Sequence, residues 1–131
     1  MKRLALLAIL VALLGSAVAL FVARRPARGP GPVRTVVLHM SGYAFNGTNP
    51  TLSFRPGERV RFLLRNEETT PIVHDFRIVG FDAPAESAIA PGETRAVAVT
   101  MPGAGRYAYT CATHRGMGGA IVVTEGAPPG P

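Results

Sequence analysis

The sequence predicts an all-β domain, a sandwich of two β-sheets with Greek-key connections. Seven or eight short segments are rich in β-branched and apolar residues. The 131 residues include 15 glycines and 12 prolines, many of which stand between these segments as turn signals. Long amphipathic helical patterns are absent from the sequence. Short strands separated by turns in this way are typical of a β-sandwich.

The first three predicted strands are bounded by clear turn signals. Residues 33–40 are β-branched and apolar, and the segment 41–50 that follows contains Asn-Gly and Asn-Pro, both turn dipeptides. A short strand at 51–55 ends at Pro-Gly. In 59–66 apolar residues alternate with arginines, and this period of two predicts a strand with one buried face.

The later strands are predicted from the same kind of composition. Residues 83–90 form the least regular segment, with proline-containing breaks on both sides. The other strands are expected at 72–79, 94–101, 106–111 and 119–124.

The N-terminus predicts a hydrophobic helix that is either a secretion signal or a membrane anchor. Lys2 and Arg3 precede an uncharged run, residues 4–23, which is just long enough to span a bilayer. The small residues at 17–19 also fit a cleavage site, so both interpretations stay open. In either case we expect a periplasmic domain, or one on the extracytoplasmic face of the cell membrane. The predicted organisation is 1–23 signal or anchor, 24–32 Pro/Gly/Arg linker, 33–125 folded domain and 126–131 flexible tail.

The net charge of +6 does not indicate nucleic-acid binding. Five basic residues flank the N-terminal apolar run, and residues 32–131 contain nine arginines against eight carboxylates. A basic patch with interleaved aromatic residues is not present in the sequence. We therefore expect no nucleic-acid partner.

The single cysteine lies in a run that predicts a metal site. Cys111, His114 and Met117 form the pattern C-x-x-H-x-x-M, and His74 lies upstream in a predicted strand. One cysteine cannot form an internal disulfide, and its neighbours favour a metal ligand over a free thiol. A thiolate, two imidazoles and a weak thioether are the ligands of a blue-copper site. Zinc sites more often have four strong ligands, so zinc is the weaker choice.

The strand pattern places these residues where one ion could join them. Cys111 is expected at the end of a strand, and His114 and Met117 on the loop to the last strand. Some alternatives remain open: Cys111 as a small buried hydrophobe, His74 without a ligand role, and Met117 as a gap-filling side chain. Glu67 and Glu68 are interpreted as a polar pair in a loop. The four expected metal ligands are His74, Cys111, His114 and Met117.

Taken together, these motifs resemble the cupredoxin family of small blue-copper proteins over about residues 33–125. The short ligand loop is most similar to that of amicyanin and other plastocyanin-like members. The resemblance implies an eight-stranded Greek-key sandwich with one type 1 copper ion, held equatorially by both histidines and Cys111 and axially by Met117. It also implies that the backbone N–H of Asp75 donates to the thiolate. Arg115 departs from the family, because many short-loop members have proline there.

The resemblance implies a protein that carries single electrons between redox protein partners. We expect a monomer that is not an enzyme, with the exposed edge of His114 as the exit for the electron. Gly116 and Met117 are expected to form a hydrophobic docking patch beside it. The alternative is a copper-binding or delivery module that supplies an oxidase, and a metal-free structural sandwich is a third possibility. Cys111 favours electron transfer, because copper chaperones tend to use methionine and histidine without a strand-borne cysteine.

Overall fold

The structure is a computed structural model that describes residues 31–128. This part of the chain consists of β-strands and contains no helix, so the all-β prediction is confirmed. Correspondingly, no helix within residues 31–128 could cross a membrane. The predicted N-terminal helix lies outside the described residues. The strands are β1 (Val33–Ser41), β2 (Ala44–Phe45), β3 (Leu52–Phe54), β4 (Arg59–Asn66), β5 (His74–Val79), β6 (Glu86–Ile89), β7 (Thr94–Thr100), β8 (Gly105–Thr110) and β9 (Gly118–Val123).

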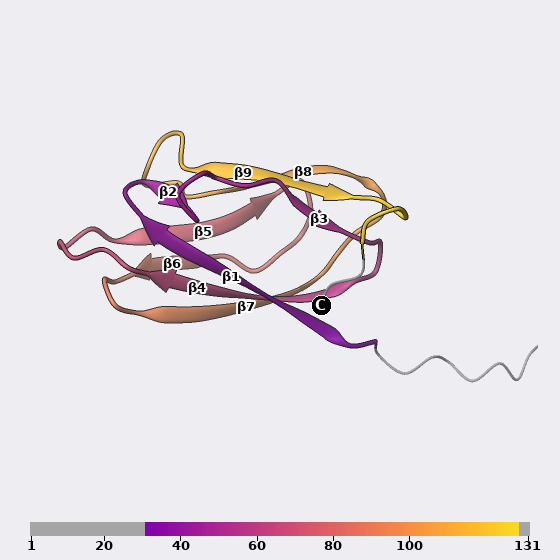
Figure 1. The fold of residues 1–131 in the computed structure, drawn as a ribbon, viewed down its shortest axis with the longest axis horizontal. Coiled ribbons are helices and arrows are strands. Elements are labelled where there is room, and N and C mark those ends of the chain that lie inside the picture. The colour runs from indigo at the N-terminus through magenta and orange to yellow at the C-terminus, as the bar shows by residue number, and fades with distance from the viewer. Residues whose placement is uncertain (1–30, 129–131) are drawn as a thin grey trace, which may run out of the picture. The chain divides into compact units, whose positions relative to one another are not determined.

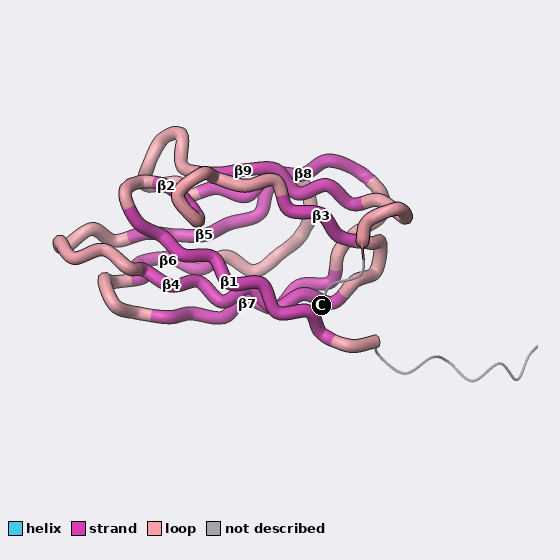
Figure 2. Tube along the Cα trace, viewed as in Figure 1, coloured by secondary structure: helices cyan, strands magenta, loops and turns pink. Residues whose placement is uncertain are grey.

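The strands form two sheets that lie face to face as a sandwich (Figures 1 and 2). One sheet has the order β2-β1-β4-β7 and the other has the order β3-β9-β8-β5-β6. β1 pairs with β4, and β3 with β9, in parallel, whereas the other neighbouring strands are antiparallel. β5 and β9 begin, and β8 ends, at the left-hand end of the sandwich in Figure 1.

The core follows the predicted alternation of side chains. In β4, the apolar residues Val60, Phe62 and Leu64 are at most 1% exposed, whereas the three arginines of the strand face solvent. Large side chains from both sheets meet in the interior, and Phe45 packs edge-on against Tyr109 with ring centroids 5.1 Å apart. Each fully buried side chain of this size stabilises the fold by roughly 1.5–3 kcal/mol.

One strand was not predicted from the sequence. β2 lies in the segment 41–50, which was expected to contain only turns, and it pairs antiparallel with the end of β1. Gly42 and Tyr43 join the two strands with positive φ angles of 59° and 62°. Positive φ at both central residues is the geometry of a tight hairpin turn. This turn carries Tyr43 to the end of the sandwich where β5 begins.

The described chain remains packed on the sandwich slightly beyond the predicted domain end. Ala127 is 2% exposed, and its carbonyl accepts a hydrogen bond of 2.7 Å from Arg55 Nε. The predicted flexible tail, 126–131, lies only partly within the described residues, so the boundaries of the domain stay a prediction.

Candidate metal centre

Three of the four expected ligands meet at one end of the sandwich. His74 is the first residue of β5, Cys111 directly follows β8, and His114 lies on the loop between β8 and β9. One ligand atom from each residue lies within 4.8 Å of the other two. The thiol Sγ is 3.9 Å from Nδ1 of His74 and 3.4 Å from Nδ1 of His114.

An irregularity in β5 brings two consecutive residues to this site. The register between β5 and β6 shifts between His74 and Phe76, as in a β-bulge. The three residues His74, Asp75 and Phe76 are therefore all buried, where a regular strand would alternate. Bulges often re-aim a side chain next to a functional site.

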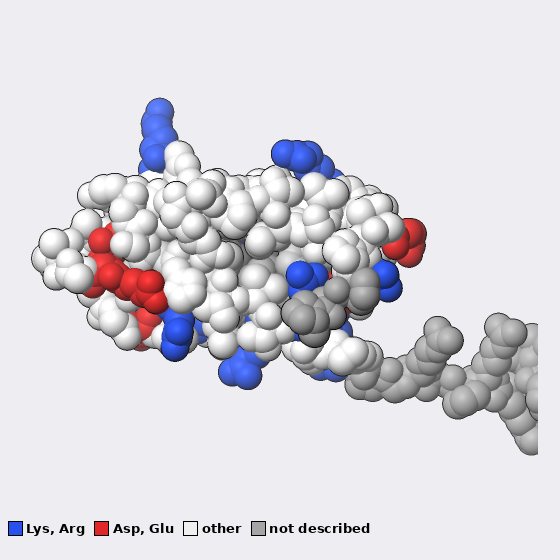
Figure 3. All heavy atoms as spheres, viewed as in Figure 1, with Lys and Arg blue, Asp and Glu red and all other residues white. Residues whose placement is uncertain are grey.

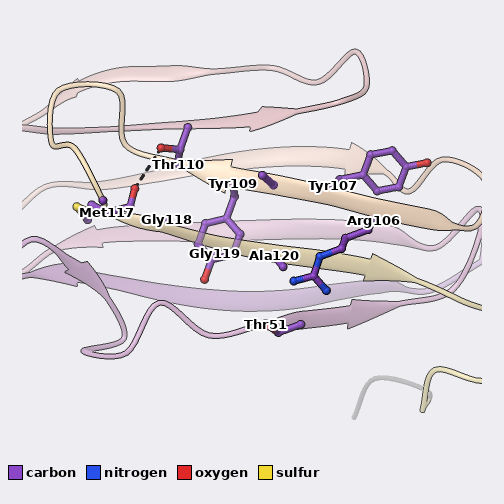
Figure 4. Close-up of a pocket in the computed structure, with 11 residues that line it drawn as sticks. Thr51, Arg106, Tyr107, Tyr109, Thr110, Met117, Gly118, Gly119 and Ala120 are labelled. Atoms are coloured by element: carbon purple, nitrogen blue, oxygen red, sulfur yellow. Dashed lines mark hydrogen bonds between the residues drawn. The ribbon is translucent and has the colours of Figure 1, made fainter.

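Closure of the ligand loop places Met117 next to Cys111. The backbone N–H of Cys111 donates to the carbonyl of Met117 at 2.9 Å, and the N–H of Met117 donates to the carbonyl of His114 at 3.1 Å. The hydroxyl of Thr110 also donates to the Met117 carbonyl at 3.2 Å (Figure 4, dashed line). Met117 is only 1% exposed, so the expectation that it contributes to a docking surface is wrong. Its assignment as the axial ligand stays a prediction.

Asp75 ties the ligand loop to β5 in two ways. Its backbone N–H donates to Sγ of Cys111 at 3.4 Å, which is the contact implied by the family resemblance. Its carboxylate accepts hydrogen bonds from the backbone N–H groups of Ala112 at 2.7 Å and Thr113 at 2.9 Å. Burial by itself would raise the pKa of the Asp75 carboxyl, but these hydrogen bonds, with the Thr113 hydroxyl and the charge of Arg77, hold that pKa below its usual value.

The role of the Asp75 side chain was missed in the sequence. The available signal was its position, because an acidic residue inside an apolar strand needs hydrogen-bond donors if it is buried. Thr113 was also missed, although its hydroxyl lies 3.1 Å from Sγ of Cys111.

The site is closed to solvent except on the side of His114. His74 is fully buried and Cys111 is 2% exposed, whereas His114 is half-buried. The ring of Tyr43, itself 54% exposed, packs edge-on against the His114 imidazole with centroids 4.9 Å apart. Arg115, on the same loop, is exposed. An imidazole edge beside an aromatic ring is therefore the part of the site nearest to solvent.

The sequence suggested that Glu68 is one of two polar loop residues, but the structure places it against a candidate ligand. Its carboxylate lies 3.1 Å from Nε2 of His74, and its side chain is 10% exposed. Glu67 does fit the expectation, because its side chain is 50% exposed and contacts His39 instead. Carboxylates gather at this end of the molecule, seen at the left in Figure 3.

The spacing and type of the donor atoms fit one copper ion. With metal–donor bonds of about 2.0–2.3 Å, three donors in a plane around an ion lie roughly 3.5–4 Å apart. The two sulfur–nitrogen separations, 3.4 and 3.9 Å, match this spacing. Among residues 31–128, no other histidine, cysteine or carboxylate joins these three residues. A thiolate with two imidazoles and a nearby methionine is a donor set for copper rather than for structural zinc.

Comparison with solved structures shows the same fold. The chain is similar to auracyanin B, with 24% identity and a TM-score of 0.60 over 72% of this chain and 91% of that one. It is also similar to auracyanin A, a "blue" copper protein of Chloroflexus aurantiacus, with 21% identity and a TM-score of 0.58 over 71% of this chain and 100% of that one. A copper-containing nitrite reductase from Thermus scotoductus matches with 25% identity and a TM-score of 0.57, over 70% of this chain but only 28% of the enzyme.

Among sequence comparisons, no curated protein matches the chain significantly. The family model of the cupredoxin-like domain, however, matches residues 6–123, which is most of the sequence. The match includes both β5 and the loop that carries Cys111 and His114. This chain therefore belongs to the cupredoxin family.

Proposed function

We propose that this protein binds one copper ion in a type 1 site and carries single electrons between redox proteins. The observation that carries this proposal is the meeting of one thiol and two imidazole nitrogens in a buried site with a single half-exposed edge. His74, Cys111 and His114 would hold the ion in a plane, and Met117 would be the weak axial ligand. When bound, copper supplies a one-electron couple between Cu(II) and Cu(I).

The protein's own contribution is to hold these ligands in fixed positions. Asp75 fastens the start of the ligand loop through two backbone N–H groups. The backbone bonds between Cys111 and Met117 close the other end of the loop. A rigid ligand set needs little rearrangement when the charge of the ion changes, which favours fast transfer. Buried His74 and Cys111 are shielded from water, so His114 is the natural point of electron entry and exit.

The setting of this function is also a proposal. The sequence of residues 1–23 supports export or membrane anchoring. Residues 24–32 would be a linker, and residues 33–125 would be the copper-binding domain on the extracytoplasmic side. The similar auracyanin A is described as a blue copper protein, which agrees with a carrier of electrons. We propose that the chain acts as a monomer and catalyses no bond chemistry of its own, since four protein ligands would leave no open position on the ion for a substrate.

Loading the purified full-length protein with Cu(II) tests this function. Thiolate coordination should give an intense blue or green colour that disappears on reduction. Cys111→Ser should abolish the colour, and His39→Ala should keep it, because His39 lies outside the ligand group and pairs with Glu67. A colourless protein that still binds copper would favour copper delivery, and a protein that binds no copper would overturn both functions.

A further inference from the structure

Glu68 is a nearly buried carboxylate that faces a ring nitrogen of the most buried candidate ligand. Its Oε1 lies 3.1 Å from Nε2 of His74, and the two side chains are 10% and 0% exposed. We propose that Glu68 is a positioning residue of the metal site, which orients His74 and favours Cu(II) over Cu(I). This inference rests on the proposed function and deepens it.

The contact selects one tautomer of His74. An ionised carboxylate accepts hydrogen bonds and cannot donate them, so Nε2 must carry a proton. In the neutral ring, Nδ1 then keeps its lone pair, and Nδ1 is the atom that lies 3.9 Å from Sγ of Cys111. The hydrogen bond on one ring nitrogen decides which nitrogen is free to bind a metal. Glu68 therefore leaves Nδ1 of His74 unprotonated and free to bind a metal.

The carboxylate is held in place by groups outside its own flexible side chain. The backbone N–H of Gly42 donates to Oε1 of Glu68 at 2.8 Å. The backbone N–H of Glu68 donates to Oδ1 of Asn66 at 3.0 Å. Asn66 is 1% exposed, and its amide donates to the carbonyls of Ile72 at 2.9 Å and Ile89 at 2.8 Å. Glu68 is thus fixed between the β1–β2 turn and the end of β4.

The same turn supports the second imidazole. Tyr43 directly follows Gly42, and its ring packs against His114. Gly42 binds the carboxylate that orients His74. The turn between β1 and β2 therefore supports both histidines. Gly42 binds Glu68, which faces His74, and the ring of Tyr43 packs against His114.

The charge of Glu68 gives the sign of its effect. A carboxylate that accepts from a ligand imidazole makes that imidazole a better electron donor to the metal. The interaction is strengthened because the pair is withdrawn from water, where the effective dielectric constant is low. The more highly charged Cu(II) gains more from this donation than Cu(I), so Glu68 should lower the reduction potential.

Two neighbouring glutamates provide a matched test in the full-length, copper-loaded protein. Glu68→Gln and Glu67→Gln each remove one negative charge, but only Glu68 contacts a ligand. Outer-shell partners of metal ligands typically change metal affinity by 10–100-fold. We expect Glu68→Gln to lower the ratio of Cu(II) affinity to Cu(I) affinity at least tenfold. A tenfold change raises the reduction potential by ~59 mV for one electron. Glu67→Gln should shift it several times less. Equal shifts in the two variants, or none, would overturn the inference.

Nitrogen chemical shifts of the metal-free protein provide a readout that is independent of copper chemistry. His74 should be protonated on Nε2 alone in the unchanged protein. In Glu68→Ala, which leaves no side-chain acceptor beside Nε2, it should become a mixture of tautomers. A proton on Nδ1 of the unchanged protein would refute the role of Glu68. If the unchanged protein shows no thiolate colour with copper, the proposed function fails, and the tautomer measurement still decides the orientation of His74.

Discussion

At the scale of single residues, Asp75 connects the two segments that carry the candidate ligands. Its carboxylate accepts from the two residues that follow Cys111, and its side chain is 5% exposed. We predict that Asp75→Asn lowers the stability of the metal-free protein by about 1–3 kcal/mol, since hydrogen bonds to a buried charge are replaced by weaker ones. Chemical denaturation of the metal-free protein measures this change.

The same substitution should raise the reduction potential of the copper protein, because it removes a negative charge close to the thiolate. The backbone N–H of Asp75 is unchanged, so the thiolate colour should persist. Asp82→Asn, at an exposed position, is the matched control and should change neither quantity appreciably. If both variants behave alike, the carboxylate does not hold the loop in the way described.

At the scale of elements, the close approach of β8 and β9 depends on glycine. A Cβ built on Gly118 would lie 2.4 Å from the carbonyl oxygen of Tyr109 and 3.0 Å from Cα of Thr110, both backbone atoms. Overpacking of this kind costs typically 1–3 kcal/mol. We predict that Gly118→Ala destabilises the protein by about that amount and disturbs the adjacent Met117. Thermal unfolding and the visible spectrum of the copper-loaded variant measure the two effects.

Gly103→Ala serves as the control for this strand pair. A Cβ at Gly103 meets no atom within 4 Å, so the variant should unfold like the unchanged protein. A Gly118→Ala variant as stable as Gly103→Ala would show that the two strands can separate without cost.

The elements also show which features a sequence can predict. β4 was predicted with its bounds because the alternation of apolar residues and arginines is local and strong. β2 was missed because two residues between turn signals give no periodic pattern, and only the pairing with β1 creates the strand. Glu68 was misjudged for a related reason. Its neighbours in sequence are polar, and its burial comes from contacts with Gly42 and His74, which the fold brings together.

At the scale of the whole molecule, the ligand site is built into the hydrophobic core. Cys111 and Met117 belong to the buried cluster that joins the inner faces of the two sheets. The ligand loop is also fastened by bonds within the protein, from Asp75 and between Cys111 and Met117. The fold should therefore not require a metal to form.

We therefore predict that removing copper leaves the sandwich folded but less stable. A ligand that binds only the folded state stabilises it by about 4.1 kcal/mol when its free concentration is 1,000 times its dissociation constant. The circular dichroism of the metal-free protein in the far ultraviolet should match that of the copper protein, while its unfolding temperature should be lower. Hydrogen exchange should increase most in the loop 111–117 and at the start of β5, and least in β4, whose side chains fill the core. Loss of the β-sheet spectrum on chelation would instead mean that the metal is part of the folding energy, as in small zinc domains.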